Sequence, residues 1–252
     1  MNITYLMLLS PLHTGGTTQE GNLLGIARES HTNLPYIPSS TIRGRLRASV
    51  TDQDQKFALF GNEIADGAQL EQGSIWIGDG SLLWIPVPSL SHGVVWISCP
   101  LLIKRWLRAS GKNLPIPLEY STNLGRERQI YLKDAILDKN SLKQWNQAKD
   151  YIKGSDIEKV IILPDQHCAT LIQMCLWRQV KIKLDEHKVV DGGFRYEEAI
   201  PPDSLMYFTW GITAQANGSS DQARQKFQQI LPNLMQIGGQ ESLGRGFVQV
   251  VN

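Results

Sequence analysis

Apolar and polar positions along the chain predict strands at both ends and in the middle. Compact apolar runs rich in β-branched and aromatic residues predict buried strands. These runs cover residues 3–10, 74–77, 81–87, 94–98, 158–163, 204–213 and 247–251. Asp79-Gly80 separates two of the runs and is a strong hairpin signal, so we expect a tight turn there.

Apolar residues at helical spacing predict four helices. They cover residues 39–50, 100–109, 141–152 and 221–231. The first helix follows Pro38 and begins with Ser39 and Ser40, and serine is a preferred N-cap residue.

Two glycine-rich segments lie between these elements. Residues 12–38 contain four glycines, and long ordered loops of this kind usually carry function. Residues 164–203 predict an insertion with a hairpin, and residues 238–246 form a second glycine-rich loop before the last strand. The order of elements predicts an α+β fold with a ferredoxin-like core, a long N-terminal loop and an inserted middle region.

The composition is that of a globular protein, with 42% hydrophobic and 19% charged residues. Lysine and arginine total 25 against 24 acidic residues, so any attraction to nucleic acid must come from local clusters of cations. The three cysteines form no CxxC pair, which fits a reducing compartment. No apolar segment approaches the ~20 residues that span a bilayer. We therefore expect a cytoplasmic protein with no membrane partner.

The basic helix over residues 39–50 is the first candidate binding element. A helix N-terminus has unpaired backbone N–H groups that bind phosphate readily. Arg43 and Arg47 are four residues apart and share a face, where they repel each other unless an anion or carboxylate lies between them. A nucleic-acid backbone would satisfy them, and so would surface acids on a solvated face. With Arg28 and the preceding glycines included, the nucleic-acid contact and the solvated helix face are equally well supported.

The second candidate is the loop that contains Gly238, Gly239 and Arg245. Four glycines in nine residues allow the backbone to approach a ligand closely. The loop has neither the GxGxxG pattern of dinucleotide-binding proteins nor the GK[ST] of a Walker loop. The glycine-rich sequence is consistent with a tight turn between two strands, and equally with a phosphate-binding loop that carries one arginine.

Aromatic residues offer a third binding signal. Phe194 and Tyr196 flank Arg195 beside the Gly192-Gly193 loop, where their rings are placed to stack on a base. Such stacking contributes roughly 1–3 kcal/mol per base.

The signals for catalysis are weak. Asp165, His167, Cys168 and Cys175 lie close together but lack the spacing of zinc ligands, so we expect no bound metal. His13 has acid–base chemistry, although a lone histidine after a strand is more often structural. No GxSxG serine elbow is present. No catalytic residue is assigned, and a stand-alone α+β enzyme with a ligand at the glycine loop stays open as an alternative.

Five segments, in order, resemble the RAMP superfamily, specifically the repeating backbone subunit of type III-B (Cmr) CRISPR complexes. They are LSPLHTGG, ARESHTNLPYIPSSTIRGRLR, LFGNE, IPVPSLSHGVVWISCPLLIKRW and IGGQESLGRG. The resemblance implies one RAMP domain over residues 1–252, with an RRM-like palm and an inserted thumb. The palm would comprise about residues 1–109 and 204–252, and the insertions and thumb about 110–203.

The resemblance also implies that copies of the protein stack along a guide RNA, while the thumb enters the guide–target duplex. The implied partners are CRISPR guide RNA, complementary target RNA, further copies of the chain and other subunits of the effector complex. Contacts of this kind hold the RNA backbone without reading its sequence. The expected RNA-binding residues are His13, Arg28, Ser39, Ser40, Arg43, Arg47, Gly238, Gly239 and Arg245.

The sequence departs from this family at one position. Members that cut target RNA carry an aspartate shortly before an arginine-acid pair, here residues 28–29, and it aligns with Leu23 or Leu24. Leucine neither binds a metal ion nor accepts a proton, so metal-assisted or acid–base cleavage is not available there. We expect binding without cutting. A ribonuclease that uses Glu20 or His13 stays open, and only this alternative calls for a divalent metal such as Mg²⁺ as cofactor.

Overall fold

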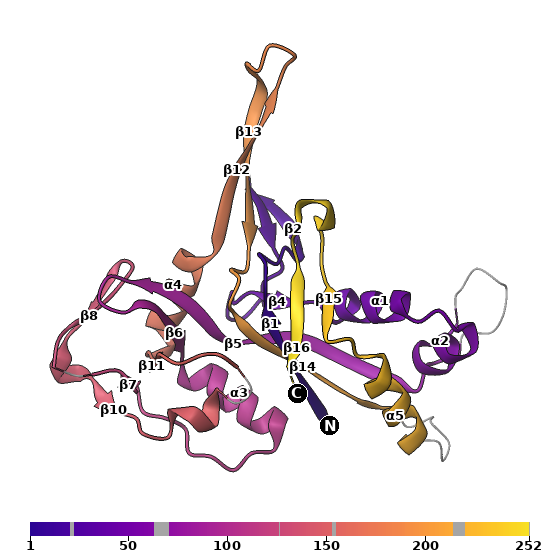
Figure 1. Ribbon diagram of the computed structural model, residues 1–252, viewed down its shortest axis with the longest axis horizontal. Coiled ribbons are helices and arrows are strands. Elements are labelled where there is room, and N and C mark those ends of the chain that lie inside the picture. The colour runs from indigo at the N-terminus through magenta and orange to yellow at the C-terminus, as the bar shows by residue number, and fades with distance from the viewer. Residues whose placement is uncertain (21–22, 63–70, 126, 153–154, 214–219, 252) are drawn as a thin grey trace.

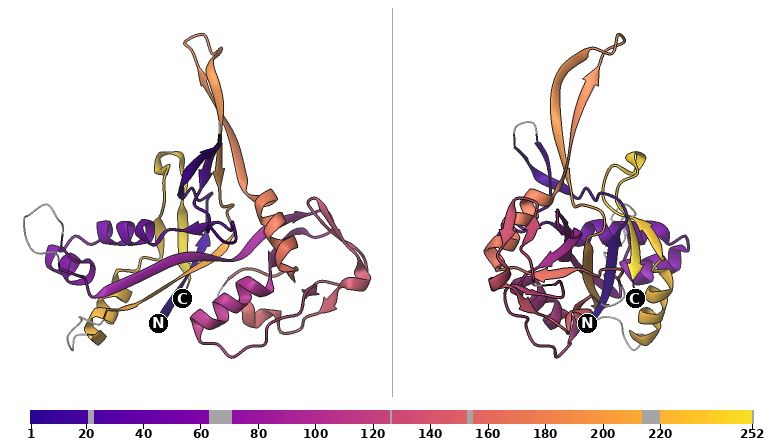
Figure 2. Two further views of the ribbon diagram at one scale, coloured as in Figure 1. Left: turned by 180° about the vertical axis from the view of Figure 1, so that it is seen from behind. Right: turned by 60° about the vertical axis from the view of Figure 1, so that its left-hand side comes forward.

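The computed structural model describes residues 1–20, 23–62, 71–125, 127–152, 155–213 and 220–251, and for residues 17–20 and 220 it describes the backbone alone. Its body carries a long two-stranded ribbon that projects away from the remaining elements (Figures 1 and 2). The ribbon consists of β12 (Trp177–Leu184) and β13 (Val190–Ala199), which pair antiparallel. The hairpin expected within residues 164–203 is therefore confirmed.

The centre of the body is an antiparallel arrangement of four strands in the order β5-β14-β1-β16. These are β1 (Asn2–Leu8), β5 (Ile75–Ser89), β14 (Leu205–Ile212) and β16 (Phe247–Val251). Helix α1 (Ser39–Ser49) lies between β1 and β5 in the chain, and α5 (Ser220–Ile230) lies between β14 and β16. The first strand thus pairs with two strands from the last fifth of the chain.

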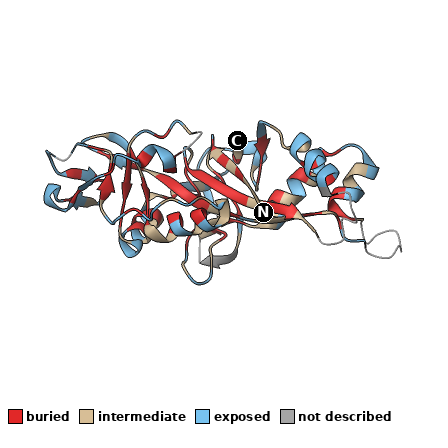
Figure 3. Ribbon diagram, turned by 90° about the horizontal axis from the view of Figure 1, so that it is seen from below, coloured by how far each residue is buried: buried red, intermediate tan, exposed pale blue. Residues whose placement is uncertain are grey.

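Strand β1 is buried on one face and half-buried on the other, and its alternating side chains face two different cores. Leu6 and Leu8 join the core that also contains residues of α1 and α5. Tyr5 and Met7 pack against the second core, which contains Trp84 and residues of α3 (Pro100–Ser110). Helices therefore cover both faces of the central strands, and buried residues concentrate in those strands (Figure 3).

Further strands extend the sheet beyond β5 and β16. The sheet continues through β6 (Gly93–Ser98), β11 (Val160–Ile162), β7 (Ser121–Thr122) and β10 (Lys143–Gln144) on one side, and β15 (Leu234–Gln236) pairs with β16 on the other. The remaining elements are β4 (Tyr36–Ile37), β8 (Ile130–Leu132), β9 (Ala135–Leu137), α2 (Gln53–Phe60), α4 (Asp165–Cys175) and the 3₁₀ helices η2 (Lys139–Ser141), η3 (Ala148–Tyr151) and η4 (Glu241–Leu243). The sequence patterns did not predict α2 and α4.

The hairpin expected at Asp79-Gly80 is wrong, because β5 continues through both residues. Gly80 is needed for close approach: a Cβ there would lie 2.9 Å from the Cβ of Ile37 on β4, which pairs with β5 at this point. Asp79 accepts a hydrogen bond of 2.7 Å from the backbone N–H of Ser39. The two residues thus join β5 to the start of α1 and do not turn the chain.

Three further expectations are corrected. The segment 12–38 is not one loop, because it contains β2 (Gly15–Glu20), β3 (Leu23–Ile26) and β4. The N-cap of α1 is Pro38, without a side-chain cap, and no serine fills that position. The expected helix over 141–152 is replaced by β10 and η3: Leu142, Trp145, Ala148 and Tyr151 are buried at every third position, a spacing that suits a 3₁₀ turn, and Ile152 is buried beside them.

Phe227 on α5 is fully buried, and its ring lies 4.5 Å from that of Trp210 and 6.4 Å from that of Phe60. We predict that Phe227→Ala lowers the free energy of unfolding by about 3–5 kcal/mol, because it leaves a cavity between α5 and the central sheet. Urea denaturation followed by circular dichroism measures the change. Phe57→Ala is the matched control, since that side chain is 40% exposed, and an equal loss in both variants would contradict the packing described.

Candidate nucleic-acid interface

A shallow groove of about 420 Å³ brings α1 beside the C-terminal glycine-rich loop. Its lining comes from three parts of the chain: Gly15 at the start of β2; Ser40, Thr41, Gly44 and Arg45 of α1; and Gln236 at the end of β15 with Gly238 and Gly239 after it. Three of the predicted RNA-binding residues, Ser40, Gly238 and Gly239, therefore lie together. The sequence could not show this, because the pairing of β1 with β16 brings the two ends of the chain together.

Arg45 is the cation of this groove, and the sequence analysis did not select it. The side chain is exposed, and within the described ranges it makes no hydrogen bond and no ion pair. Gly44 precedes it on the surface of the helix, and a Cβ at Gly44 would meet nothing within 4 Å. The groove thus offers a free guanidinium beside bare backbone, which suits an extended anion.

The glycine-rich loop is held against the segment after β1. The backbone N–H of Gly239 donates to the carbonyl of His13 at 2.9 Å. Gly238 has φ +79°, and a Cβ there would collide with the same carbonyl oxygen. Glycine is therefore required at 238 by both conformation and close approach.

His13 itself is 5% exposed, and its Nδ1 lies 2.7 Å from the carbonyl oxygen of Glu198. Because a carbonyl only accepts, neutral His13 carries its proton on Nδ1 and leaves Nε2 as the acceptor. This contact positions the imidazole between the glycine-rich loop and the end of β13.

Arg43 and Arg47 lie on a different side of α1 and bind backbone. Arg43 donates to the carbonyls of Phe60 at 2.5 Å and Ile75 at 3.3 Å. Arg47 donates to the carbonyls of Phe60 at 3.2 Å and Gly61 at 2.7 Å. Both guanidinium groups thus satisfy carbonyls at the end of α2, and partial burial, with Arg47 nearby, lowers the pKa of Arg43. The sequence analysis offered RNA phosphates or surface carboxylates as partners of these two arginines, and the structure shows backbone carbonyls instead.

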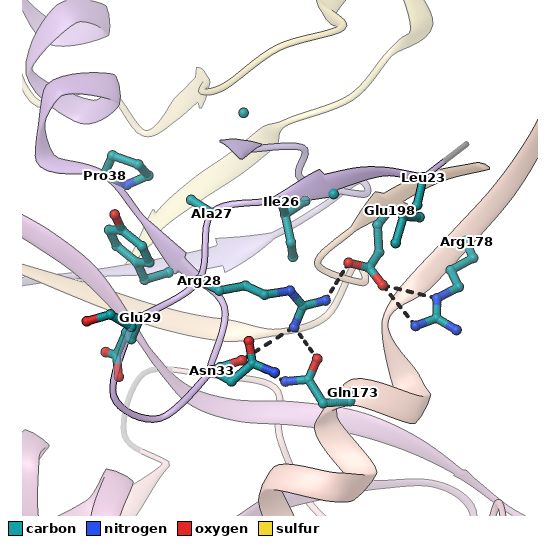
Figure 4. Close-up of a pocket in the computed structure, with 14 residues that line it drawn as sticks. Leu23, Ile26, Ala27, Arg28, Glu29, Asn33, Pro38, Gln173, Arg178 and Glu198 are labelled. Carbon is teal, nitrogen blue, oxygen red and sulfur yellow. Dashed lines mark hydrogen bonds and ion pairs between the residues drawn. The ribbon is translucent and has the colours of Figure 1, made fainter. Parts of the chain in front are cut away.

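Arg28 lies in a separate cavity of about 640 Å³ at the foot of the ribbon (Figure 4). It donates to the fully buried carboxylate of Glu198 at 2.5 Å and to the side-chain oxygen of Gln173. Arg178 of β12 binds the other oxygen of Glu198 at 3.0 Å. Leu23, one of the two positions at which the resemblance places the family's aspartate, lines the same cavity.

Arg245 is buried on the opposite side of β13. It donates to the carboxylate of Glu197 at 3.0 Å and to the side chain of Gln179 at 2.7 Å, and its guanidinium lies 4.5 Å from the ring centre of Trp177. Lys181 at 2.8 Å and Arg195 at 3.0 Å also pair with Glu197. We call Glu197, Glu198 and their five cations the ribbon base.

Above the ribbon base, the two faces of the ribbon differ. One face carries exposed apolar residues, namely Val180, Ile182, Phe194 and Tyr196. Lys181 and Arg195 pair across the other face. Phe194 and Tyr196 lie in β13 and not in a loop, with ring centres 5.5 Å apart. Lys181 and Lys183, two positions apart, were the sequence signal for this second face.

The predicted RNA-binding residues thus separate into three places. Ser40, Gly238 and Gly239 line the groove, with Ser39 at the start of α1. Arg43 and Arg47 bind the end of α2, while His13, Arg28 and Arg245 contact the end of β13. Glu20 falls where the structure describes backbone alone.

Comparison with known proteins identifies the family. The profile of the RAMP superfamily matches residues 5–249, nearly the whole chain. The chain belongs to the RAMP superfamily. Its sequence is 29% identical over 276 residues to the CRISPR system Cmr endoribonuclease Cmr4 of Pyrococcus furiosus, covering 97% of this chain and 93% of that protein. It is 28% identical over 127 residues to the CRISPR system CMR subunit Cmr4 of Saccharolobus solfataricus, covering 48% and 39%.

Solved structures share the RAMP fold seen here. A chain in the cryo-EM structure of the type III-B Cmr-beta bound to cognate target RNA superposes with a TM-score of 0.80 and 18% identity, covering 99% of this chain and 95% of that one. The crystal structure of oligomeric Cmr4 from Pyrococcus furiosus gives a TM-score of 0.73 and 22% identity, covering 99% and 96%. These matches confirm a mixed α+β RAMP architecture.

The described part of this RAMP chain contains no group of three or more His, Cys, Asp or Glu side chains arranged to hold a metal ion. None of the helices described is long and apolar enough to cross a membrane.

Burial acts to raise the pKa of Glu197, but the hydrogen bond and charge of Lys181, together with Arg245, outweigh it and leave the pKa below its ordinary value. A depressed pKa contributes stability above the unfolded value of about 4.3 that is lost as the pH falls through the folded value. We predict that Glu197→Gln lowers the free energy of unfolding by about 1–3 kcal/mol at pH 7, and that the difference shrinks below pH ~4. Urea titrations at several pH values measure it.

The control for this pH series is Glu186→Gln, whose side chain is 87% exposed near the tip of the ribbon. It should leave stability unchanged across the range. A constant difference between wild type and Glu197→Gln at every pH would contradict the charge-based explanation.

Proposed function

We propose that this protein is an RNA-binding backbone subunit of a type III CRISPR effector complex, assembled as repeated copies along guide RNA, and that it holds target RNA without cutting it. The observation that carries the binding role is the groove between α1 and the glycine-rich loop, where Arg45 has no partner among the described residues. Similarity to Cmr4 over 97% of the chain supports the same assignment.

The architecture supports a division into palm and thumb. The order β5-β14-β1-β16, with α1 and α5 as the two crossover helices, is the arrangement expected of a ferredoxin-like palm. The projecting ribbon of β12 and β13 is the thumb in this proposal, and it lies within the insertion expected over residues 110–203. Residues 1–252 then form one RAMP domain.

The guide backbone is proposed to follow the groove, in contact with Ser39, Ser40, Gly238, Gly239 and Arg45. Bare backbone and hydroxyl groups there approach phosphate without distinguishing bases, which suits a guide of variable sequence. Arg43, Arg47 and Arg245 already bind protein acceptors, so their proposed role is to hold α1, α2 and the glycine-rich loop in place beside the RNA. Arg28 and His13 have the same role toward the ribbon.

The absence of cutting rests on Leu23 and Leu24. Both lie in β3, where they pair with Tyr196 and Glu197 of β13. A leucine at either place supplies no ligand for a metal ion and no acid or base. The strand therefore presents an apolar side chain beside the cavity where the family's cleaving members carry an aspartate.

We predict that Arg45→Gln weakens RNA binding to a similar extent for RNAs of unrelated sequence, because the contact is with phosphate. It should also reduce the slope of log affinity against log salt by about 1. Arg224→Gln is the control, since Arg224 lies on α5 and does not line the groove. Fluorescence anisotropy over a salt series measures both quantities, and an unchanged slope would contradict the proposed path.

For the assembled complex with guide RNA and Mg²⁺, we predict that complementary labelled RNA is bound and stays intact. Binding and cleavage are scored on matched native and denaturing gels, with Leu23→Asp and Leu24→Asp complexes run beside the wild type. Cuts at regular intervals by the wild type would overturn the proposal. Loss of those cuts in Glu20→Ala or His13→Ala would then identify the group that acts.

An endoribonuclease is the second candidate, and one observation favours it. The tautomer imposed by the Glu198 carbonyl leaves Nε2 of His13 free to accept a proton, next to the glycine-rich loop. The relative from Pyrococcus furiosus is itself named an endoribonuclease. A cut that does not require a divalent metal and disappears in His13→Ala would support this candidate.

A further inference from the structure

The buried part of the ribbon contains two carboxylates. In β13, the first seven residues are exposed and the last three, Glu197, Glu198 and Ala199, are buried. In β12, Trp177 and Lys181 are half-buried and the other residues are exposed. The buried apolar residues Leu176 and Ile200 lie just outside the two strands, so apolar packing anchors their ends, while the buried side chains within the strands are mainly charged.

The two glutamates bind opposite sides of the body. Successive residues of a strand point to opposite faces, so Glu197 and Glu198 cannot share partners. Glu198 binds Arg28, which also binds Gln173 of α4, and so it connects the ribbon to the N-terminal segment and α4. Glu197 binds Arg245, and so it connects the ribbon to the glycine-rich loop.

Charge at these positions is not explained by stability alone. Well-packed apolar residues of similar size often stabilise a protein as well as a buried ion pair does, whereas ion pairs with fixed hydrogen bonds restrict geometry. Arg178 approaches Glu198 through both Nε and Nη2 at 3.0 Å, a directional contact. Among the described residues, the backbone adds a short parallel pairing, in which Tyr196 and Glu197 oppose Leu23 and Leu24 of β3, and a bridge between Leu12 and Ile200 just after β13.

A small rotation at this region has a large effect at the tip. Val190 lies seven residues from Glu197 along β13, which corresponds to roughly 23 Å at about 3.3 Å per residue. A rotation of roughly 10° would displace that point by about 4 Å, more than the ~3.4 Å spacing of bases along a strand. Phe194 lies three residues from Glu197, about 10 Å along the strand, so the same rotation would displace it by about 2 Å, roughly half of that spacing. Its placement on a nucleic acid therefore depends on the direction of the ribbon.

We infer that Glu197 and Glu198 are positioning residues, which set the direction of the ribbon by pairing it with the N-terminal segment on one face and the glycine-rich loop on the other. The inference concerns the geometry of this chain, and its consequence for RNA rests on the proposed function. Loss of either charge leaves the ribbon paired but allows it to point in a range of directions.

The test is a distance measurement between the tip and the body of the full chain. Spin labels are placed at Lys188→Cys on the tip and Lys104→Cys on α3. Cys175 is partly exposed and is replaced by Ala in every variant, whereas Cys99 and Cys168 are buried and stay unlabelled. Pulsed electron paramagnetic resonance gives the width of the distance distribution. We expect Glu197→Gln and Glu198→Gln each to broaden it at least two-fold.

Asp191→Asn is the matched control. It removes a carboxylate that pairs with Lys183 at 2.7 Å in the same ribbon, but at an exposed position near the tip. It should leave the width unchanged, and circular dichroism well below the melting transition should show the same folded spectrum in all labelled proteins. Widths equal to wild type in both glutamate variants would overturn the inference, as would equal broadening by Asp191→Asn.

A second arm separates this inference from the proposed function. Chemical footprinting of a guide–target duplex in the wild-type complex should show distorted positions at regular intervals, which Glu197→Gln makes weaker and less regular. If the wild-type complex gives no regular pattern, the proposed role of the ribbon as a thumb fails. The widths of the distance distributions still decide whether Glu197 and Glu198 set the direction of the ribbon. Broadened widths with an unchanged pattern would overturn its consequence for RNA.

Discussion

The insertion of β1 between β14 and β16 is the constraint on which the other features depend. Six register pairs join β1 to β14 and four join it to β16, so residues near both ends of the chain form the middle of the sheet. This pairing brings the segment after β1 against the glycine-rich loop, where Gly239 binds the carbonyl of His13. Without it, neither the groove nor the contact between His13 and β13 would exist. Such non-local pairing also closes long loops, at a cost in chain entropy that the two cores offset.

Much of the central sheet was predictable because its signals are local. β1, β14 and β16, and helices α1, α3 and α5, show their apolar periodicity directly in the sequence. The errors arose where distant residues decide the local structure. Asp79-Gly80 resembles a turn, yet Gly80 serves the approach of Ile37, more than forty residues earlier in the chain. The segment 12–38 resembles a loop, yet β3 forms a strand because β13 supplies its partner.

The candidate site divides in the same way. The glycine at 238 could be singled out from the sequence because its backbone role is local: a positive φ and a close contact require it. The choice among arginines was not predictable, since helical spacing places Arg43 and Arg47 on one face without showing what that face meets. The carbonyls at the end of α2 accept their hydrogen bonds, and α2 itself was not predicted. Arg45, two residues from each of them and therefore on the opposite side of the helix, lines the groove.

The positions of the charged residues explain why the chain is nearly neutral overall and still has a locally positive surface. The buried carboxylates of Glu197 and Glu198 neutralise cations that hold the ribbon, so those cations contribute geometry more than attraction. An exposed cation such as Arg45 is then free to act on an external anion. A protein that binds RNA of any sequence needs both kinds: free charge supplies affinity, while paired charge fixes the surfaces between which the RNA lies. Net charge combines the two, and for that reason the composition alone was uninformative about RNA.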